Sequence, residues 1–98
     1  MVGDAIQVAP NSYKTIFEND RVRLLEYKGG PGNKTEMHSH PDLLAYTVAG
    51  GKFKFTLDNG QSFEAEMGTG DSMFVEGQNH STENIGSTNA HILLVELK

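Results

Sequence analysis

Cysteine is absent from the 98-residue sequence. Without cysteine the fold cannot contain a disulfide, no thiolate can bind a metal, and no thiol can act as a nucleophile. Any metal that the chain holds must therefore be bound through nitrogen and oxygen donors. The length predicts a single domain, residues 1–98, with one modest hydrophobic core.

Positive charge is scarce as well. Eight Lys and Arg stand against thirteen Asp and Glu, which gives a net charge of −5, and the basic residues form no block or stripe along the sequence. Nucleic acids and anionic membrane surfaces attract clustered positive charge. We therefore expect neither of them as a partner.

Long apolar runs are missing too. The longest is Ile92–Val95, and residues 1–8 lack the basic start and apolar core of a secretory signal. A membrane-spanning helix needs about 20 predominantly apolar residues. The sequence therefore predicts a soluble, cytoplasmic protein with no membrane segment.

Amphipathic helical periodicity is almost absent, whereas several short windows alternate apolar and polar residues. Residues 52–57 place their apolar side chains on one face of a predicted strand, and residues 62–67 alternate in the same way. The Asn59-Gly60 pair between these segments suits the positive φ angles of a tight turn. The sequence thus predicts a β-hairpin.

Six further segments have the composition of strands, and turn residues separate them at regular intervals. They are Thr15–Glu18, Val22–Tyr27, Leu43–Ala49, Ser72–Val75, Ser81–Asn84 and His91–Leu97. Such spacing indicates an all-β sandwich or barrel with little or no helix. Residues 1–12 fit either a loose N-terminal arm or an extra edge strand, and both remain open.

Three histidines have the spacing of a metal site. His38 and His40 are two positions apart, so on a strand both side chains point to the same face. A third imidazole, from His80 on a neighbouring strand, would complete a set of three nitrogen donors for a divalent metal. The alternative is that these histidines are ordinary surface or core residues with backbone partners.

The residues around these histidines resemble the two sequence motifs of the cupin superfamily. The first motif is matched by Gly32, His38, His40 and Gly50, and the second by Gly70, Asp71, Gly77, His80 and Asn84. The resemblance spans residues 29–86. It implies a conical double-stranded β-helix, or jelly roll, whose motif histidines hold iron, manganese, nickel, zinc or copper.

One ligand of the usual motif is missing. Cupins commonly supply a glutamate shortly after the paired histidines, but the expected slot, Leu43 or Leu44, is apolar in this chain. The resemblance therefore implies one divalent metal per chain on three histidines, with Fe(II) favoured and Zn, Mn or Ni also compatible. A neutral donor set leaves the metal its full positive charge and open positions, which favours an anionic, chelating ligand.

Cupin dioxygenases that cleave β-diketones use three histidines and Fe(II), and this chain resembles them in its ligand set. The resemblance implies an iron-dependent oxidoreductase acting on a small enolisable or anionic substrate. Two alternatives stay open. One is a cupin that binds a small molecule without catalysis, and the other is a Zn-, Mn- or Ni-dependent isomerase or hydrolase.

The sequence also gives expected roles to five residues near the motifs. Glu76, an acid where the second motif usually has a small residue, is the candidate catalytic acid or base. Glu36 is a candidate to accept an imidazole N–H, and Asp42 is a weaker candidate for an extra ligand. We expect Asn84 to tie a turn and His91 to be a hydrogen-bonded strand residue outside the site.

The oligomeric state follows from the fold class. Small barrels leave strand edges unpaired, and pairing the edges or packing one sheet against that of a partner is the usual way to cover them. We therefore expect a homodimer. The expected partners are thus a small-molecule substrate and a second copy of the chain.

Overall fold

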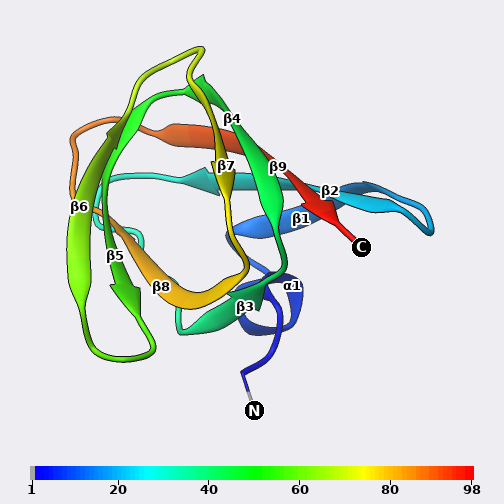
Figure 1. Ribbon diagram of the computed structural model, residues 1–98. Helices are drawn as coiled ribbons and strands as arrows, with labels where there is room; N and C mark the ends of the chain where they lie inside the picture. The colour runs from blue at the N-terminus through cyan, green and yellow to red at the C-terminus, as the bar shows by residue number, and fades with distance from the viewer. Residues whose placement is uncertain (1) are drawn as a thin grey trace.

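Two antiparallel β-sheets face each other in the computed structural model, which describes residues 2–98 (Figure 1). The elements are α1 (Ala5–Val8), β1 (Tyr13–Glu18), β2 (Val22–Gly29), β3 (His38–His40), β4 (Leu43–Ala49), β5 (Gly51–Leu57), β6 (Ser62–Met67), β7 (Ser72–Val75), β8 (Gln78–Asn84) and β9 (Ala90–Leu97). One sheet has the strand order β1-β2-β9-β4-β7, and the other has the order β3-β8-β5-β6. From β3 onward the chain passes repeatedly between the two sheets, as in a jelly roll.

The predicted fold class, an all-β double-stranded β-helix, is confirmed. Each strand expected from the alternating pattern is present, and several extend one to three residues beyond the predicted limits. The only helix among residues 2–98 is the four-residue α1. No helix in this described part of the chain is long and apolar enough to cross a membrane.

The predicted hairpin is formed by β5 and β6, but its turn is wider than the Asn59-Gly60 pair suggested. Only Gly60 has a positive φ, of 87°. Asn59 contributes through its side chain instead, because its Oδ1 accepts the backbone N–H of Gln61 at 2.9 Å. The loop closes where the N–H of Leu57 donates to the carbonyl of Gln61 at 2.8 Å.

The N-terminal segment, for which a loose arm and an extra edge strand were both open, contains the short helix α1, and Asp4 just before it forms an isolated parallel bridge with Ser39. Asp4 caps this helix: its Oδ1 accepts the N–H of Gln7 at 2.9 Å, and the Gln7 Oε1 accepts the N–H of Asp4 at 3.2 Å. This reciprocal pair is a capping box. The N–H of Ser39 in β3 donates to the carbonyl of Gly3 at 2.8 Å, and Ala5 is fully buried. The segment therefore covers the free edge of β3.

Removing the cap should loosen this cover. We expect Asp4→Ala to lower the free energy of unfolding by about 1–2 kcal/mol, because an N-cap is lost at the helix start. Asp4→Asn should retain most of the stability, since the amide oxygen can still accept the N–H of Gln7. Urea denaturation of both variants measures the difference, and equal stability of Asp4→Ala and the wild type would contradict the capping role.

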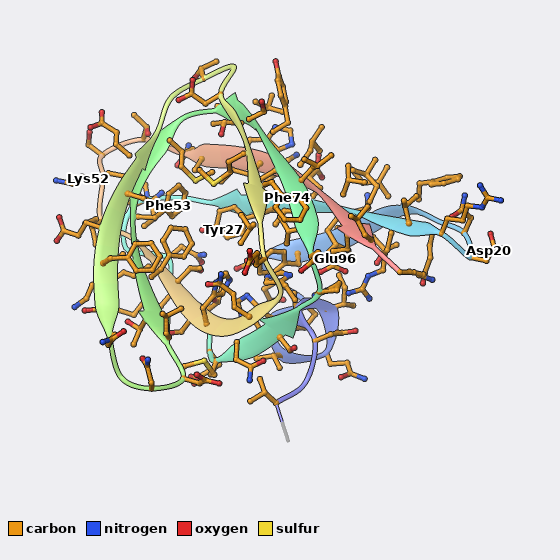
Figure 2. All side chains as sticks on the ribbon, in the orientation of Figure 1. Asp20, Tyr27, Lys52, Phe53, Phe74 and Glu96 are labelled. Atoms are coloured by element: carbon orange, nitrogen blue, oxygen red, sulfur yellow. The ribbon has the colours of Figure 1, made fainter. Side chains whose placement is uncertain are left out.

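The interior of the barrel is apolar toward one end and polar toward the other. Tyr27 and Phe53 lie inside, with 3% and 2% of their surface exposed, while Lys52 extends outward (Figure 2). The apolar core also contains Ala5, Tyr13, Leu25, Leu43, Ala45, Met67, Ala90, Ile92 and Leu94. The polar end, beside α1 and β3, contains four buried titratable groups: His38, His40, His80 and Glu96.

Candidate metal centre

The three predicted histidines meet at the polar end of the barrel. His38 and His40 point inward from β3, and His80 lies on β8 directly opposite His38 in the ladder. The ring centroids are 4.7, 4.9 and 5.0 Å apart. One nitrogen from each ring lies within 4.8 Å of the other two. Sequence reasoning therefore identified the three members of this cluster correctly.

Hydrogen bonds on the far side of His38 and His40 fix the tautomer of each ring. The Nδ1–H of His38 donates to the carbonyl of Glu36 at 2.8 Å, and the Nδ1–H of His40 donates to the Glu96 carboxylate at 2.7 Å. A carbonyl and a carboxylate can only accept, so each Nδ1 carries the proton. In the neutral form of each ring, the Nε2 is therefore the unprotonated nitrogen.

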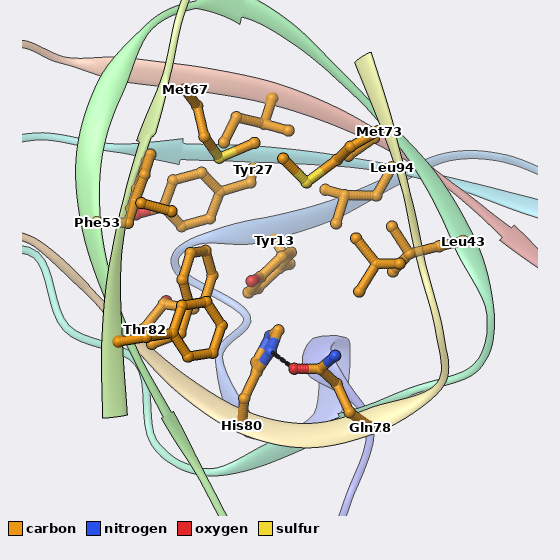
Figure 3. A pocket seen from close by; sticks show the side chains of 16 residues that line it. Tyr13, Tyr27, Leu43, Phe53, Met67, Met73, Gln78, His80, Thr82 and Leu94 are labelled. Atoms are coloured by element: carbon orange, nitrogen blue, oxygen red, sulfur yellow. Dashed lines mark hydrogen bonds between the residues drawn. The ribbon is translucent and has the colours of Figure 1, made fainter. Parts of the chain in front are cut away.

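His80 is held in the same way by an amide. Its Nδ1 lies 3.1 Å from the Oε1 of Gln78 (Figure 3). The Nε2 of Gln78 donates to the carbonyl of Glu76 at 3.2 Å, which orients the amide with its oxygen toward His80. All three imidazoles thus turn an unprotonated Nε2 inward, the arrangement in which histidine binds metal.

The electrostatics of the cluster also suit a cation. Burial lowers the pKa of His38 to about 4. Burial, together with the neighbouring imidazoles of His40 and His38, lowers the pKa of His80 to about 3. Both rings are therefore neutral at neutral pH, as metal ligands must be. The Nε2 of His40 is fully buried and has no hydrogen-bond partner within residues 2–98. A buried acceptor without a partner is costly, and a metal would satisfy it.

Glu96 is one of two site residues that sequence reasoning missed. Its carboxylate is 2% exposed and accepts hydrogen bonds from His40 and from the Nε of Arg23 at 2.8 Å. Burial works to raise the pKa of Glu96, but the bonds from His40 and Arg23 outweigh burial and hold it below the usual value. Arg23 also pairs with Asp4 at 3.1 Å. A line of alternating charges thus joins His40 to the cap of α1.

The pattern of β9 contains a signal for Glu96. Ala90, Ile92 and Leu94 are buried and alternate with less buried residues, so the next inward position is Glu96. An acid at an inward position of a strand needs a buried partner. His40, which points into the same end of the barrel from β3, supplies that partner.

Tyr13 is a second residue that sequence reasoning missed. It points inward from β1, and its hydroxyl donates to the Nε2 of His38 across 3.3 Å. Its ring lies 5.2 Å from that of His38 and 5.7 Å from that of His40, centroid to centroid. Burial raises the pKa of Tyr13, so the phenol keeps its proton. The site therefore includes a neutral hydrogen-bond donor beside the imidazole nitrogens.

An apolar cavity of about 160 Å³ opens above His80 (Figure 3). Its walls come from both sheets and consist mainly of Leu, Ile, Val, Met, Phe and Tyr side chains, with Gln78, His80 and Thr82 at the polar end. No acidic side chain lines it among the described residues. A cavity of about 150 Å³ accepts a molecule the size of benzene.

The structure separates the remaining candidates. Glu76 is exposed in the turn between β7 and β8 and is not among the residues that line the cavity, so its catalytic role stays a prediction. Asp42 is not in the histidine cluster, and its Oδ1 accepts the N–H of Gly77 at 2.7 Å. Glu36 does serve as an imidazole acceptor, but through its backbone carbonyl and not through its carboxylate.

The structural roles expected for Asn84 and His91 are confirmed. The Nδ2 of Asn84 donates to the carbonyls of Gly29 and Thr88, both at 3.0 Å, and its Oδ1 accepts the N–H of Gly86. His91 lies outside the cluster and pairs with Glu26 at 2.7 Å. Leu43, at the position of the missing glutamate ligand, is buried and lines the cavity.

Solved structures share this fold. A cupin domain from Bordetella pertussis is 25% identical, with a TM-score of 0.79 over 88% of this chain and 91% of that one. An RmlC-like cupin family protein from Methanocaldococcus jannaschii is 14% identical, with a TM-score of 0.68 over 87% and 77% of the two chains. The polyketide cyclase RemF from Streptomyces resistomycificus is 23% identical, with a TM-score of 0.63, and the match covers 87% of this chain and 63% of the cyclase.

Among curated proteins, no sequence matches the chain significantly. The family comparison is decisive, because the sequence model of the cupin domain matches residues 25–96. That range includes the three clustered histidines and most of the barrel. The chain therefore belongs to the cupin domain family.

Proposed function

We propose that the protein binds one divalent metal through the Nε2 atoms of His38, His40 and His80 and acts as an iron-dependent dioxygenase on a small enolisable molecule. The observation that carries the metal site is the set of three anchored Nδ1 atoms, which turns every Nε2 inward. The buried, unpartnered Nε2 of His40 supports it independently. Fe(II) would supply the activation of O₂ and the oxidation of the substrate.

The surroundings of the histidines favour this chemistry over acid–base catalysis. An isomerase or hydrolase usually needs a carboxylate or histidine beside its substrate to move protons. The cavity is lined by no acid among residues 2–98, and the histidine that lines it is one of the proposed ligands. A redox reaction at the metal places less demand on side-chain bases.

The chain's own residues would bind and orient the substrate. The apolar walls of the cavity exclude water and accept a hydrocarbon or aromatic body, while a polar enolate end would lie toward His80. The Tyr13 hydroxyl, now donating to the Nε2 of His38, would lose that acceptor once the nitrogen is a ligand. It would then donate to an oxygen of the substrate and hold that end in place.

Elemental analysis tests the proposal directly. The untagged protein is purified beside His40→Ala, its metal content is measured, and O₂ consumption is followed with β-diketones such as acetylacetone. Near-stoichiometric iron that is lost in the variant, together with O₂ uptake, supports a dioxygenase. If the protein instead contains another metal and turns over substrate without consuming O₂, the dioxygenase proposal is wrong and the reaction is non-redox. Metal binding without any turnover would favour a binding protein.

The role of Tyr13 gives a separate prediction. We expect Tyr13→Phe to keep its metal but to bind acetylacetone about tenfold more weakly, because one hydrogen bond to an anion is lost. Tyr27→Phe is the matched control, since Tyr27 lines the same cavity but its hydroxyl is bonded by Asn33 at 3.2 Å. Titration of the metal-loaded proteins measures both affinities. Equal affinity of Tyr13→Phe and the wild type would remove Tyr13 from substrate binding.

A further inference from the structure

The outer face of the five-stranded sheet carries an apolar row that crosses every strand. Phe74 of β7 is opposite Leu44 of β4, and Leu44 is opposite Val95 of β9. Val95 is opposite Leu24 of β2, and Leu24 is opposite Phe17 of β1. We call these five residues the outer row. Side chains alternate along a strand, so the row faces away from the buried residues on either side of it.

Much of the outer row is open to solvent. Phe17, Leu44 and Phe74 are 53%, 49% and 55% exposed, while Leu24 and Val95 are half-buried. Tyr46 stands on the same face at 50% exposure. Single exposed apolar residues are normal on a soluble protein, but a contiguous apolar patch marks a contact surface.

The exposed area approaches what a stable dimer needs. Three aromatic residues of this face, Phe17, Tyr46 and Phe74, are about half exposed. Each offers about 100 Å², since a whole aromatic side chain buries 150–250 Å². The exposed apolar area of the whole face is roughly 600 Å² once the other apolar residues are added. These are Leu44, Val48 and Leu97 and the half-buried Leu24 and Val95. One partner contributes about 800 Å² to a standard interface, of which a polar rim is part.

The order of residues in the outer row indicates what covers it. Read from either edge of the sheet, the row is Phe, Leu, Val, Leu, Phe. A two-fold axis parallel to β9, between two facing sheets, would place Leu44 of one copy against Leu24 of the other and Val95 against its own equivalent. It would also place Phe74 against Phe17. Such self-complementarity is the requirement of an isologous interface.

The polar residues beside the row fit the same axis. The neighbouring row runs Ser72, Tyr46, Leu93, Glu26 and Lys14 across the five strands. The two-fold axis places Tyr46 opposite Glu26 and Ser72 opposite Lys14. Both are pairs of a hydroxyl with a charged group, so no like charges meet. If the axis had placed like charges opposite each other, the face would not fit a second copy of the chain.

We propose that the outer face of the five-stranded sheet is the interface of a symmetric homodimer, with two copies packed sheet to sheet about an axis parallel to β9. The oligomeric state is independent of the proposed chemistry, because the outer row points away from the histidines. Failure of the dimer proposal and failure of the metal-site proposal can therefore be told apart by measuring the mass and the metal content of the same samples.

Sedimentation equilibrium from about 1 to about 100 µM protein tests the interface. The wild type should have twice the chain mass of 10.7 kDa. Leu44→Glu and Leu24→Lys should each raise the dimer dissociation constant by at least about 30-fold, because each removes an apolar residue from the centre of the interface. Ser62→Glu, at an exposed strand position of the other sheet, should remain dimeric.

The double variant Leu44→Glu/Leu24→Lys tests the axis itself. Within one copy these positions are separated by β9, whereas across the proposed axis they face each other. The dimer should therefore be restored, since each introduced Glu meets an introduced Lys of the second copy. A monomeric wild type at 100 µM, or single variants that stay dimeric with unchanged thermal stability, would overturn the interface. A double variant that remains monomeric and folded would overturn the axis.

Discussion

A His80→Ala variant is expected to purify without metal and to take up added Fe(II) or Zn(II) more than about 100-fold more weakly than the wild type. Replacing even an outer partner of a ligand costs 10- to 100-fold in metal affinity, and His80 is one of only three proposed donors. The fold should be retained, because the side chain is held by a single neutral hydrogen bond to Gln78. Competition with a chromophoric chelator measures the affinity, and circular dichroism measures the fold.

His91→Ala is the matched control for this experiment. His91 also lies on a strand and is also hydrogen-bonded to a neighbour, but it is outside the cluster. Its replacement should leave the metal content unchanged. If His80→Ala retained a full equivalent of metal while folded, the three-histidine site would be wrong.

Replacing Glu96 is expected to have the largest effect on stability. Glu96→Ala should lower the free energy of unfolding by about 3–5 kcal/mol, because it removes the buried partner of Arg23 and of His40 and leaves the Arg23 guanidinium only its partly exposed pair with Asp4. The side chain of Arg23 is 15% exposed and that of Glu96 is 2% exposed. The same variant should bind metal about 10- to 100-fold more weakly, since the ring of His40 loses the acceptor that orients it.

Glu96→Gln distinguishes orientation from charge. The amide oxygen can still accept the Nδ1–H of His40, so metal affinity should recover to within about tenfold of the wild type while part of the stability loss persists. Glu64→Ala serves as the control, because Glu64 forms an exposed ion pair with Lys52 at 3.6 Å. Such pairs contribute about 0–1 kcal/mol. Chemical denaturation that found Glu96→Ala as stable as Glu64→Ala would contradict the buried role.

The sequence predicts the sheets better than the ends of the chain, for a physical reason. Strands such as β4 and β5 have one buried and one exposed face, and that difference appears directly as alternation of residue types. The four residues of α1 are too few to show a helical period. The capping pair Asp4 and Gln7 is the one local signal of this helix.

The site divides in a similar way. The sequence could identify His38, His40 and His80, because imidazoles with this spacing are typical of a metal site. Glu96 and Tyr13 act through contacts between strands far apart in the sequence, 56 residues in the case of Glu96 and His40. Such contacts depend on the register of β9 and β1, which local patterns do not determine.

The series of hydrogen bonds and ion pairs from His40 through Glu96 and Arg23 to Asp4 extends beyond the segment that matches the cupin domain. The cupin match begins at residue 25 and includes both His40 and Glu96. Arg23, Tyr13 and Asp4, which complete the surroundings of these groups, all precede it. A protein trimmed to the matched segment would keep every proposed ligand yet lose Arg23, which bonds Glu96, and Tyr13, which bonds His38. Transfer of this centre to another barrel must therefore include β1 and the cap of α1.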